Sequence, residues 1–320
     1  MRWFVIVNPA SGRSNRGTGW RAVERSLDAA GVAFEAVHTQ HPGHGEVLAR
    51  DAVRSGHRAI LAVGGDGSVN EVVQGVMTAG LAETRQVTLA VAPQGTGNDW
   101  ARSLGIGRDP DRIVAALVAG RTLLHDVGII DFPSGAAERR WFINVAGAGY
   151  DADVTARVPQ PVPSAFTYLG VALRGLSSYR CPQFTIDADG TRIEGRLLLT
   201  FVANGRYCGN RMHVAPTAEM DDGLFDLLAV RELSLLQALP KLAKLYAGRI
   251  LGDPVVRHLR AAEVRIEADP SCVVQADGQI MGRTPVSFSV SRRALTVVTG
   301  PADRSPAAAA ARPGTAPRVT

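Results

Sequence analysis

The chain has 320 residues and a formal net charge of +5; 46% of its residues are hydrophobic and 20% are charged. This composition excludes a wholly disordered or fibrous protein, and the length favours two domains. The three cysteines, Cys181, Cys208 and Cys272, lie far apart, which excludes a disulfide scaffold or a cysteine zinc site and fits a reducing cytosol. We expect no membrane-spanning helix, because no apolar run reaches about 18 residues, and no signal peptide, because a strand pattern begins at Arg2.

Strand and helix patterns alternate through the first third of the chain. This order is typical of βαβ units, which build a mostly parallel sheet covered by helices on both faces. The predicted strands are 3–7, 34–38, 59–63 and 88–92, and the predicted helices are 20–30, 46–54, 69–77 and 110–119.

From about Leu123 onward, short strand patterns separated by turn signals such as Asp189-Gly190 and Asp277-Gly278 replace this alternation. Such a pattern is typical of an antiparallel sandwich. Two helical patterns interrupt it, at 164–177 and 234–249. The predicted strands are 126–132, 141–145, 183–188, 196–202, 224–230, 263–268, 272–276, 286–290 and 294–298.

These patterns predict an α/β fold followed by an all-β fold. We expect a Rossmann-like parallel α/β domain at 1–125, completed by residues 292–300, and an antiparallel β-sandwich domain at 126–291. The Pro- and Ala-rich tail at 301–320 is predicted to be disordered.

Three predicted strands of the first domain end in unusual turns, at 8–12, 64–71 and 93–99. Because ligands of open α/β sheets bind at the carboxyl ends of the strands, we expect these turns to line one crevice. Ser68 and Glu71 have the spacing of a capping box, which predicts a helix start at Ser68, and Thr96 and Asp99 repeat that spacing. Glycine-rich turns that lead into helix N termini favour phosphate, so the turns predict a phosphate site.

The common phosphate fingerprints are absent from the sequence. No GxxxxGK[ST] occurs, and Gly147-Ala148-Gly149 lacks the third glycine of a dinucleotide motif. Asp66 lies inside the second glycine turn, and Asp99 and Asp126 occur at or just after loops at the edge of the first sheet. A bare carboxylate repels phosphates, so we predict that a shared Mg²⁺ lies between them.

The three turns, in this order, resemble the signature of the diacylglycerol kinase catalytic-domain family, which includes bacterial soluble lipid kinases, sphingosine kinases and ceramide kinases. The resemblance spans residues 3–300 and continues through 147–152, 216–226 and 277–279. It implies an ATP:lipid phosphotransferase whose nucleotide domain and sandwich domain flank a deep cleft.

The resemblance also implies site residues. Asp66, Asp99 and Asp126 match an acidic cluster that engages catalytic Mg²⁺ through water. A structural Mg²⁺ would be held by the backbone carbonyls of Glu219 and Leu224 and the carboxylate of Asp222. The positions implied to bind the nucleotide and its metal are Asn8, Pro9, Ala10, Ser11, Gly12, Thr39, Gly65, Asp66, Gly67, Ser68, Val69, Asn70, Glu71, Thr96, Asn98, Asp99 and Asp126.

The sequence departs from the family pattern at one place. The late motif is usually DGE, whereas here it is Asp277-Gly278-Gln279. A neutral Gln cannot accept a proton, although it can hydrogen-bond a hydroxyl or phosphate. The predicted catalytic residues are therefore Asp66, Gln279 and Asp277, with Asp277 as proton acceptor unless the reaction proceeds without one.

We predict that the protein transfers the γ-phosphate of ATP, with Mg²⁺, to the hydroxyl of diacylglycerol or a related lipid, in phospholipid biosynthesis. We expect it in the cytoplasm or peripherally at the inner face of the membrane. Two alternatives stay open: a kinase of a soluble acceptor, because NAD kinases share the GGDG turn, and an inactive lipid-binding relative, which Gln279 favours. The identity of the acceptor lipid, and whether the protein forms a homodimer, are also left open.

Two apolar stripes on predicted helices line an acyl pocket or dip into a bilayer, or else they belong to the core. The second stripe is accompanied by Lys241, Lys244 and Arg249. Nucleic acid is not expected as a partner, because the arginines are not interleaved with aromatic residues. The stripes are Phe166, Leu169, Leu173 and Leu176, and Leu235, Leu236, Leu239, Leu242 and Leu245.

Overall fold

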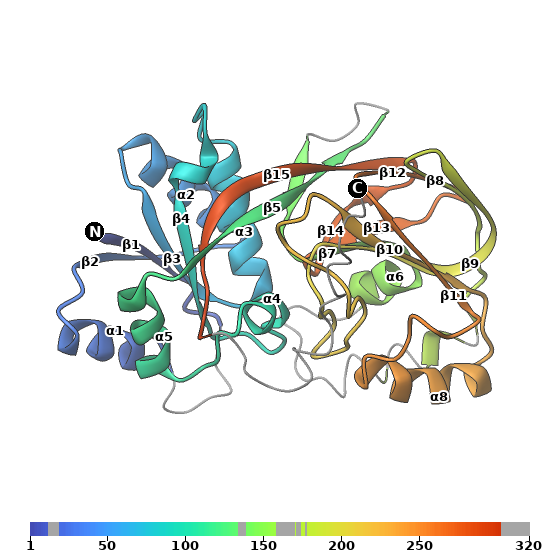
Figure 1. Ribbon diagram of the computed structural model, residues 1–320, viewed down its shortest axis with the longest axis horizontal. Coiled ribbons are helices and arrows are strands. Elements are labelled where there is room, and N and C mark those ends of the chain that lie inside the picture. The colour runs from blue at the N-terminus through green and yellow to red at the C-terminus, as the bar shows by residue number, and fades with distance from the viewer. Residues whose placement is uncertain (12–18, 134–138, 158–169, 171–173, 177, 302–320) are drawn as a thin grey trace, which may run out of the picture.

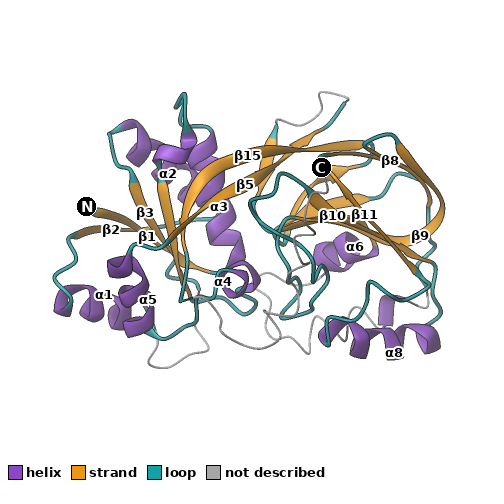
Figure 2. Cartoon of the chain, viewed as in Figure 1, coloured by secondary structure: helices purple, strands orange, loops and turns teal. Residues whose placement is uncertain are grey.

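The computed structural model describes residues 1–11, 19–133, 139–157, 170, 174–176 and 178–301. A helix-covered sheet and a strand-rich part lie side by side (Figures 1 and 2). Hydrogen bonds between strands connect the two parts. The predicted fold class, a parallel α/β domain followed by an antiparallel β domain, is confirmed.

The first part contains four parallel strands: β1 (Trp3–Val7), β2 (Phe34–His38), β3 (Ala59–Gly64) and β4 (Thr88–Pro93). Their order is β2-β1-β3-β4, with Trp3 opposite Phe34 and Phe4 opposite Ile60. The three inner strands are almost wholly buried runs of small and β-branched residues, as a parallel sheet covered on both faces requires.

Helices cover both faces of this sheet. Figure 1 shows α2 and α3 on one face and α1 and α5 on the other. A Cβ on Gly75 would lie 2.3 Å from the Glu46 carbonyl oxygen, so only glycine lets α3 pack this closely on α2. The helices are α1 (Trp20–Ala29), α2 (His44–Arg54), α3 (Asp66–Met77), α4 (Asp99–Ser103) and α5 (Pro110–Ala119), with a 3-10 turn at Thr84–Gln86.

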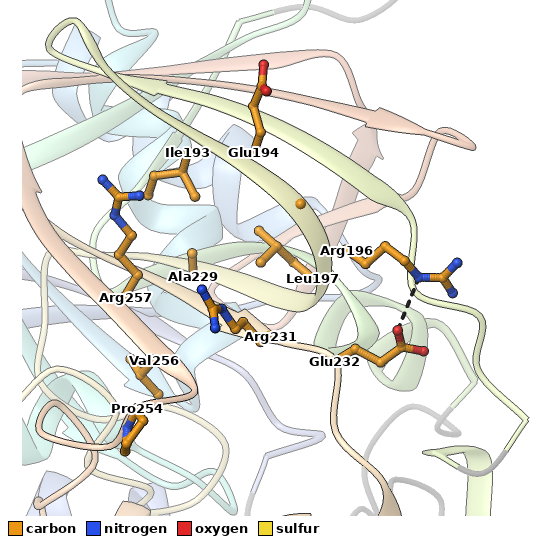
Figure 3. A pocket seen from close by; sticks show the side chains of 11 residues that line it. Ile193, Glu194, Arg196, Leu197, Ala229, Arg231, Glu232, Pro254, Val256 and Arg257 are labelled. Atoms are coloured by element: carbon orange, nitrogen blue, oxygen red, sulfur yellow. Dashed lines mark hydrogen bonds and ion pairs between the residues drawn. The ribbon is translucent and has the colours of Figure 1, made fainter.

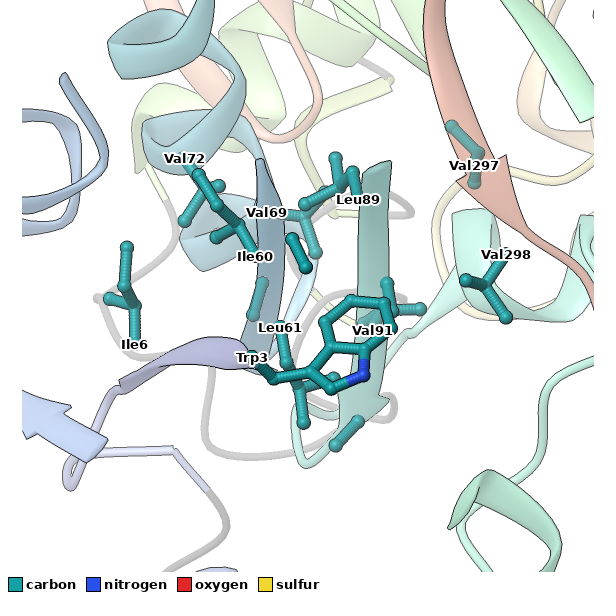
Figure 4. Packing of buried hydrophobic residues seen from close by; sticks show 14 of the residues in the cluster. Trp3, Ile6, Ile60, Leu61, Val69, Val72, Leu89, Val91, Val297 and Val298 are labelled. Carbon is teal, nitrogen blue, oxygen red and sulfur yellow. The ribbon is translucent and has the colours of Figure 1, made fainter. Parts of the chain in front are cut away.

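The core of the first part joins the sheet to α3. Ile60, Leu61 and Leu89 come from the strands, and Val69 and Val72 come from the helix (Figure 4). Burying a side chain of this size stabilises the fold by about 1.5–3 kcal/mol. The turn that precedes α3 is therefore fixed to the sheet edge by the packing behind it.

The second part is a two-layer antiparallel sandwich. Phe142, Phe184, Phe225 and Phe288 fill the space between the layers, and the ring centroids of Phe142 and Phe225 are 5.4 Å apart. One layer holds β5 (Thr122–Asp131), β6 (Arg140–Phe142), β8 (Gln183–Ala188), β12 (Glu263–Asp269) and β15 (Val286–Val298). The other holds β7 (Val145–Gly149), β10 (Phe225–Arg231), β11 (Val256–Ala261), β13 (Val273–Ala276) and β14 (Gln279–Arg283), and β9 (Thr191–Ala203) runs through both layers.

Two long antiparallel strands, β5 and β15, connect the parts. The start of β15 pairs with β12 of the sandwich, and its end pairs in parallel with β4, with Thr296 opposite Thr88. The predicted strands 286–290 and 294–298 are thus one strand. An irregularity between Ser291 and Leu295 separates the two runs, and Arg293 has a φ of 50° there.

Several sequence predictions about local structure were wrong. The helix predicted to begin at Ser68 begins at Asp66, and neither it nor α4 has a side-chain cap. The sequence patterns missed α4, β11, β14 and the helix α6 (Tyr150–Arg157). The missed elements are short or lie beside turns, where tertiary contacts outweigh local propensity.

The predicted helix at 164–177 lies largely outside the described residues, as does the predicted tail beyond residue 301. The second helical pattern forms α8 (Leu235–Tyr246), which Ser234 caps by a capping box with Gln237. Within the described ranges, none of the helices combines the length and the apolar character that crossing a bilayer would need.

Candidate active site

The three glycine-containing turns meet at the carboxyl ends of β1, β3 and β4. The Asn8 side-chain amide donates to Ser68 Oγ at 2.9 Å, which connects the first turn to the start of α3. A Cβ on Gly95 would lie 2.5 Å from the Gly65 Cα, so the second and third turns touch backbone to backbone. The turns therefore meet at one edge of the sheet, because glycine permits this approach. That all three line one crevice stays a prediction.

A pocket of about 490 Å³ opens at this edge, within the size range of small-molecule sites. Asn8, Pro9 and Ser11 line it from the first turn, and Arg21 and Arg25 line it from α1. Gln94 also lines it, and its buried side-chain nitrogen has no hydrogen-bond partner in the part of the chain that the structure describes. A bound acceptor atom would satisfy that donor, since unpaired buried donors are destabilising.

Two carboxylates of the second and third turns lie close together around Gly97. A Cβ on Gly97 would lie 3.0 Å from Asp66 Oδ2 and 3.3 Å from Asp99 Oδ2, so the glycine leaves room for both oxygens. Burial, aided by the charge of Asp99, raises the pKa of Asp66 to about 7. Burial also raises the pKa of Asp99, whose carboxylate accepts backbone hydrogen bonds from Asn210 (2.8 Å) and Arg211 (2.7 Å).

This acidic pair fits a divalent cation. Two carboxylates held close together repel each other, and a hard cation with oxygen ligands removes that repulsion. Asp66 also opens α3, whose N-terminal dipole stabilises negative charge. Asp66 and Asp99 are therefore the residues that would hold Mg²⁺.

Asp126, the third predicted acid, bonds elsewhere. Its carboxylate accepts backbone hydrogen bonds from Gly223 and Arg293, each at 2.6 Å. These contacts attach β5 to the turn before β10 and to the irregularity in β15. The structure thus brings together Asp66 and Asp99, whereas the hydrogen bonds of Asp126 serve a different junction.

Asp277 and Gly278 form the two-residue turn of the β13–β14 hairpin, with φ values of 50° and 81°. The buried Asp277 carboxylate accepts four hydrogen bonds, from Asn70 Nδ2 and the backbone N–H groups of Ile143, Asn144 and Val145, at 2.9–3.1 Å. This is the geometry of a positioning residue, which holds α3 against the segment before β7. That Asp277 accepts the substrate proton stays a prediction.

Gln279 lies next to the second turn. Its side-chain nitrogen donates to the Gly67 carbonyl oxygen at 3.2 Å, which brings the hairpin of the sandwich domain to the start of α3. A neutral amide suits this carbonyl, because it can donate a hydrogen bond where an ionised Glu could only accept.

Several predicted nucleotide residues have structural partners. Glu71 accepts from the backbone N–H groups of Gly43 (2.8 Å) and Gly45 (2.9 Å) at the start of α2, so it does not cap α3. Asn98 exchanges two hydrogen bonds with Gly95 within the third turn. The backbone N–H of Thr39 donates to Val7 at 2.9 Å. Of the predicted residues, Gly12 lies outside the described residues.

The predicted structural Mg²⁺ site surrounds the turn before β10. One Asp222 carboxylate oxygen contacts Arg260, and the other accepts from the Leu224 backbone N–H at 3.0 Å. A guanidinium therefore neutralises the one carboxylate of the predicted ligand set, so these residues do not fit a metal without rearrangement. The roles of Glu219, Asp222 and Leu224 as ligands stay predictions.

The sequence patterns did not single out the pair Asp151 and Gln275. Gln275 Nε2 donates to Asp151 Oδ2 at 3.0 Å, while the buried Oδ1 has no partner among the described residues. Burial raises the pKa of Asp151 to about 6. The position of Asp151 in the motif at 147–152 was the one feature of the sequence that could have identified it. Arg108 was also missed, and it donates to the carbonyls of Gly95 and Thr96 in the third turn.

Residues 2–130 match the family described as "Diacylglycerol kinase catalytic domain", and residues 144–299 match "YegS C-terminal NAD kinase beta sandwich-like domain". The two matches follow the two parts of the structure, so the class is that of kinases with an α/β domain and a β-sandwich domain. Within this class, the chain belongs to the diacylglycerol kinase catalytic-domain family.

Relatives match over almost their full length. A diacylglycerol kinase of Bacillus subtilis (strain 168) is 29% identical over 298 residues, which are 92% of this chain and 95% of that protein. A diacylglycerol kinase of Staphylococcus aureus (strain MRSA252) is 26% identical over 296 residues, 92% of this chain and 90% of that protein. The crystal structure of a diacylglycerol kinase from Bacillus anthracis str. Sterne shares the fold, with a TM-score of 0.72, 23% identity and coverage of 94% of this chain and 97% of that one.

Proposed function

We propose that the protein is an ATP- and Mg²⁺-dependent kinase that phosphorylates the hydroxyl of a lipid, diacylglycerol or a close relative, in phospholipid biosynthesis. The observation that carries the proposal is the pair of the partly buried Asp66 and the buried Asp99 at the edge where the glycine turns meet. The names of the relatives support the lipid as acceptor.

In this proposal, residues of the chain have three roles. Backbone N–H groups at the start of α3 donate to phosphate oxygens, and the glycines of the turns let those oxygens approach. Asp66 and Asp99 hold the cation, which neutralises charge on the transferred phosphoryl group when bound. Asp151, with one unpartnered oxygen, is the group we assign to the acceptor hydroxyl.

The test is a transfer assay with labelled ATP, Mg²⁺ and a panel containing diacylglycerol, a sphingoid base, phosphatidylglycerol and NAD, read by mass spectrometry. We expect a lipid to gain phosphate. Asp66→Ala should lower turnover by at least about a hundredfold, as expected when a group that stabilises transition-state charge is lost. The matched control is Asp131→Ala, at a half-buried aspartate of β5 that pairs with Arg139. Phosphorylation of NAD alone, or undiminished activity of Asp66→Ala, would contradict the proposal.

We also propose that the protein meets a membrane surface, on the cytoplasmic side, through α8. Leu236, Leu239 and Tyr246 are 82%, 49% and 50% exposed, and their spacing places them on one helix face. Lys241 and Lys244 do not join this face, because both bind Asp253. In flotation with anionic vesicles, the wild type should be recovered with the vesicles and the variant Leu236→Gln/Leu239→Gln should not. Equal recovery of both proteins would exclude α8 as the element that contacts the membrane.

A further inference from the structure

Arg260 reaches the turn before β10, where the family resemblance implies a structural Mg²⁺. Its place is set by strand pairing, because Arg260 on β11 lies directly opposite Asp226 on β10. Side chains that lie opposite each other share one face of a sheet, so the guanidinium is held beside the turn that leads into β10. The same register continues along the two strands, and Figure 3 shows its pair Ala229 and Arg257 side by side.

The guanidinium of Arg260 contacts two carboxylates. Its Nη2 contacts Asp222 Oδ2, and its Nε lies 3.7 Å from Asp226 Oδ2. The remaining oxygen of Asp222 accepts the Leu224 backbone N–H at 3.0 Å, so both oxygens of this carboxylate have partners. The Asp226 side chain is only 1% exposed, and a charge buried this deeply needs an opposite charge beside it.

Two further basic side chains contact the same region. Arg292 Nη2 donates to the Asp222 carbonyl oxygen at 3.4 Å, and a Cβ on Gly223 would lie 2.3 Å from Arg292 Nε. This second guanidinium therefore lies against the turn itself. His258, on the same face of β11, has its Nε2 2.7 Å from the other oxygen of Asp226. The two guanidinium groups together supply two positive charges, the same number as a divalent ion.

We propose that Arg260 serves in place of the structural cation. Its guanidinium joins Asp222 to Asp226 and so attaches the turn to β11. A guanidinium is planar, permanently charged and rich in donors, so it can serve two carboxylates at once. Mg²⁺ at this turn would have to displace the guanidinium from Asp222, because the two positive charges repel each other. The turn therefore keeps its conformation without a divalent ion, and metal acts on stability through the Asp66–Asp99 pair.

Urea unfolding of the full chain without nucleotide, in EDTA and in excess Mg²⁺ at matched ionic strength, tests the proposal. Kinase activity is not read, so a failure of the proposed function would not change the result. In Asp66→Asn, which lacks one carboxylate of the Asp66–Asp99 pair, the unfolding midpoint should be the same in EDTA and in Mg²⁺. A lower midpoint of this variant in EDTA would reveal a structural ion outside that pair and would overturn the proposal.

Arg260→Gln should lower the folding equilibrium constant in EDTA by at least about tenfold, because it removes a charge-assisted contact to two carboxylates. Arg265→Gln, at an exposed arginine of β12 that pairs with Glu267, is the matched control and should unfold as the wild type does. Wild-type stability of Arg260→Gln in EDTA would show that the guanidinium does not hold the turn, which would overturn the proposal.

A double-mutant cycle with Asp222→Asn separates the contact from any general loss of stability in the single variants. Asp222→Asn should lower the unfolding midpoint of the wild type. It should lower the midpoint of Arg260→Gln by less, because in that variant the carboxylate has already lost its partner. Equal losses in the two backgrounds would show that Asp222 and Arg260 act independently, and this result would also overturn the proposal.

Discussion

At the scale of single residues, Asp66 has the most perturbed chemistry in the candidate site. Its pKa in the folded protein is about 7, against a usual value of 3.8. A raised folded pKa favours the fold when the group is protonated, so its contribution to stability is complete below about pH 4 and is lost as the pH rises through about 7.

Asp66→Asn should therefore flatten the pH dependence of stability. Without divalent metal, we expect the wild type to lose unfolding free energy between about pH 5 and about pH 8, and the variant to lose less. Urea unfolding at the two pH values measures this. Asp131→Asn, at a half-buried aspartate that pairs with Arg139, should keep the wild-type slope. Equal slopes in wild type and Asp66→Asn would show that burial does not perturb this carboxyl.

At Gly95, the lack of space for a Cβ determines the effect of a substitution. A Cβ there would lie 2.5 Å from the Gly65 Cα, and a backbone atom cannot move aside as a flexible side chain would. Gly95→Ala should lower the unfolding free energy by about 1–3 kcal/mol and weaken nucleotide binding. Gly107→Ala, where the new methyl group would meet nothing within 4 Å, is the control for chemical denaturation. Full stability and nucleotide affinity in Gly95→Ala would contradict the close approach of the two turns.

At the scale of elements, α8 is held by a buried carboxylate. Lys241 and Lys244, the only lysines of the chain, donate to Asp253 at 2.8 and 2.7 Å. These hydrogen bonds keep the pKa of Asp253 well below its usual range. The sequence suggested that the lysines lie beside a bilayer, whereas the structure uses them to attach the helix to the loop before β11.

Asp253→Asn should loosen α8. We expect a loss of about 1.5–3 kcal/mol near neutral pH, the ordinary contribution of a hydrogen bond to a charged group. Because the folded pKa is depressed, this stabilisation is present above about pH 4 and disappears as the pH falls through the folded value. Thermal melting across that range should show the difference between wild type and variant shrink in acid. A difference that is unchanged by acid would exclude the ionised carboxylate as its cause.

At the scale of the whole molecule, the hairpin turn at Asp277 joins the two parts. It accepts hydrogen bonds from Asn70 on α3 and from the backbone at Ile143, Asn144 and Val145. Asp277→Ala would leave these donors buried without an acceptor. We expect the unfolding free energy to fall by about 3–5 kcal/mol, the usual effect of removing one partner of a buried charged network.

Calorimetry of Asp277→Ala, with Asp28→Ala on the exposed surface of α1 as control, measures this loss. Asp277→Asn separates the two roles considered for the residue. A lowered melting temperature together with weakened activity indicates positioning, whereas lost activity at the wild-type melting temperature indicates proton transfer. A stable and fully active Asp277→Asn would exclude both.

The alternation of strands and helices, the sandwich pattern and the three turns were predictable from the sequence, because hydrophobic periodicity and glycine placement are local properties. The same patterns placed Asp66 and Asp99 at one sheet edge, because parallel strands share the side at which their carboxyl ends lie. Glycines in these turns were expected because the missing Cβ lets the backbone approach a ligand. The structure shows that glycine is also needed for the contact between Gly65 and Gly95.

Hydrogen-bond partners far apart in the chain were decided only by the tertiary structure. Glu71 has the spacing of a cap for its own helix, yet the fold brings Gly43 and Gly45 to its carboxylate. Asp126 bonds Gly223 and Arg293, and Asp277 bonds Asn70, 207 positions away. The sequence determines which groups are available, but a buried carboxylate accepts from whichever donors the packing leaves beside it, and no local pattern specifies that choice.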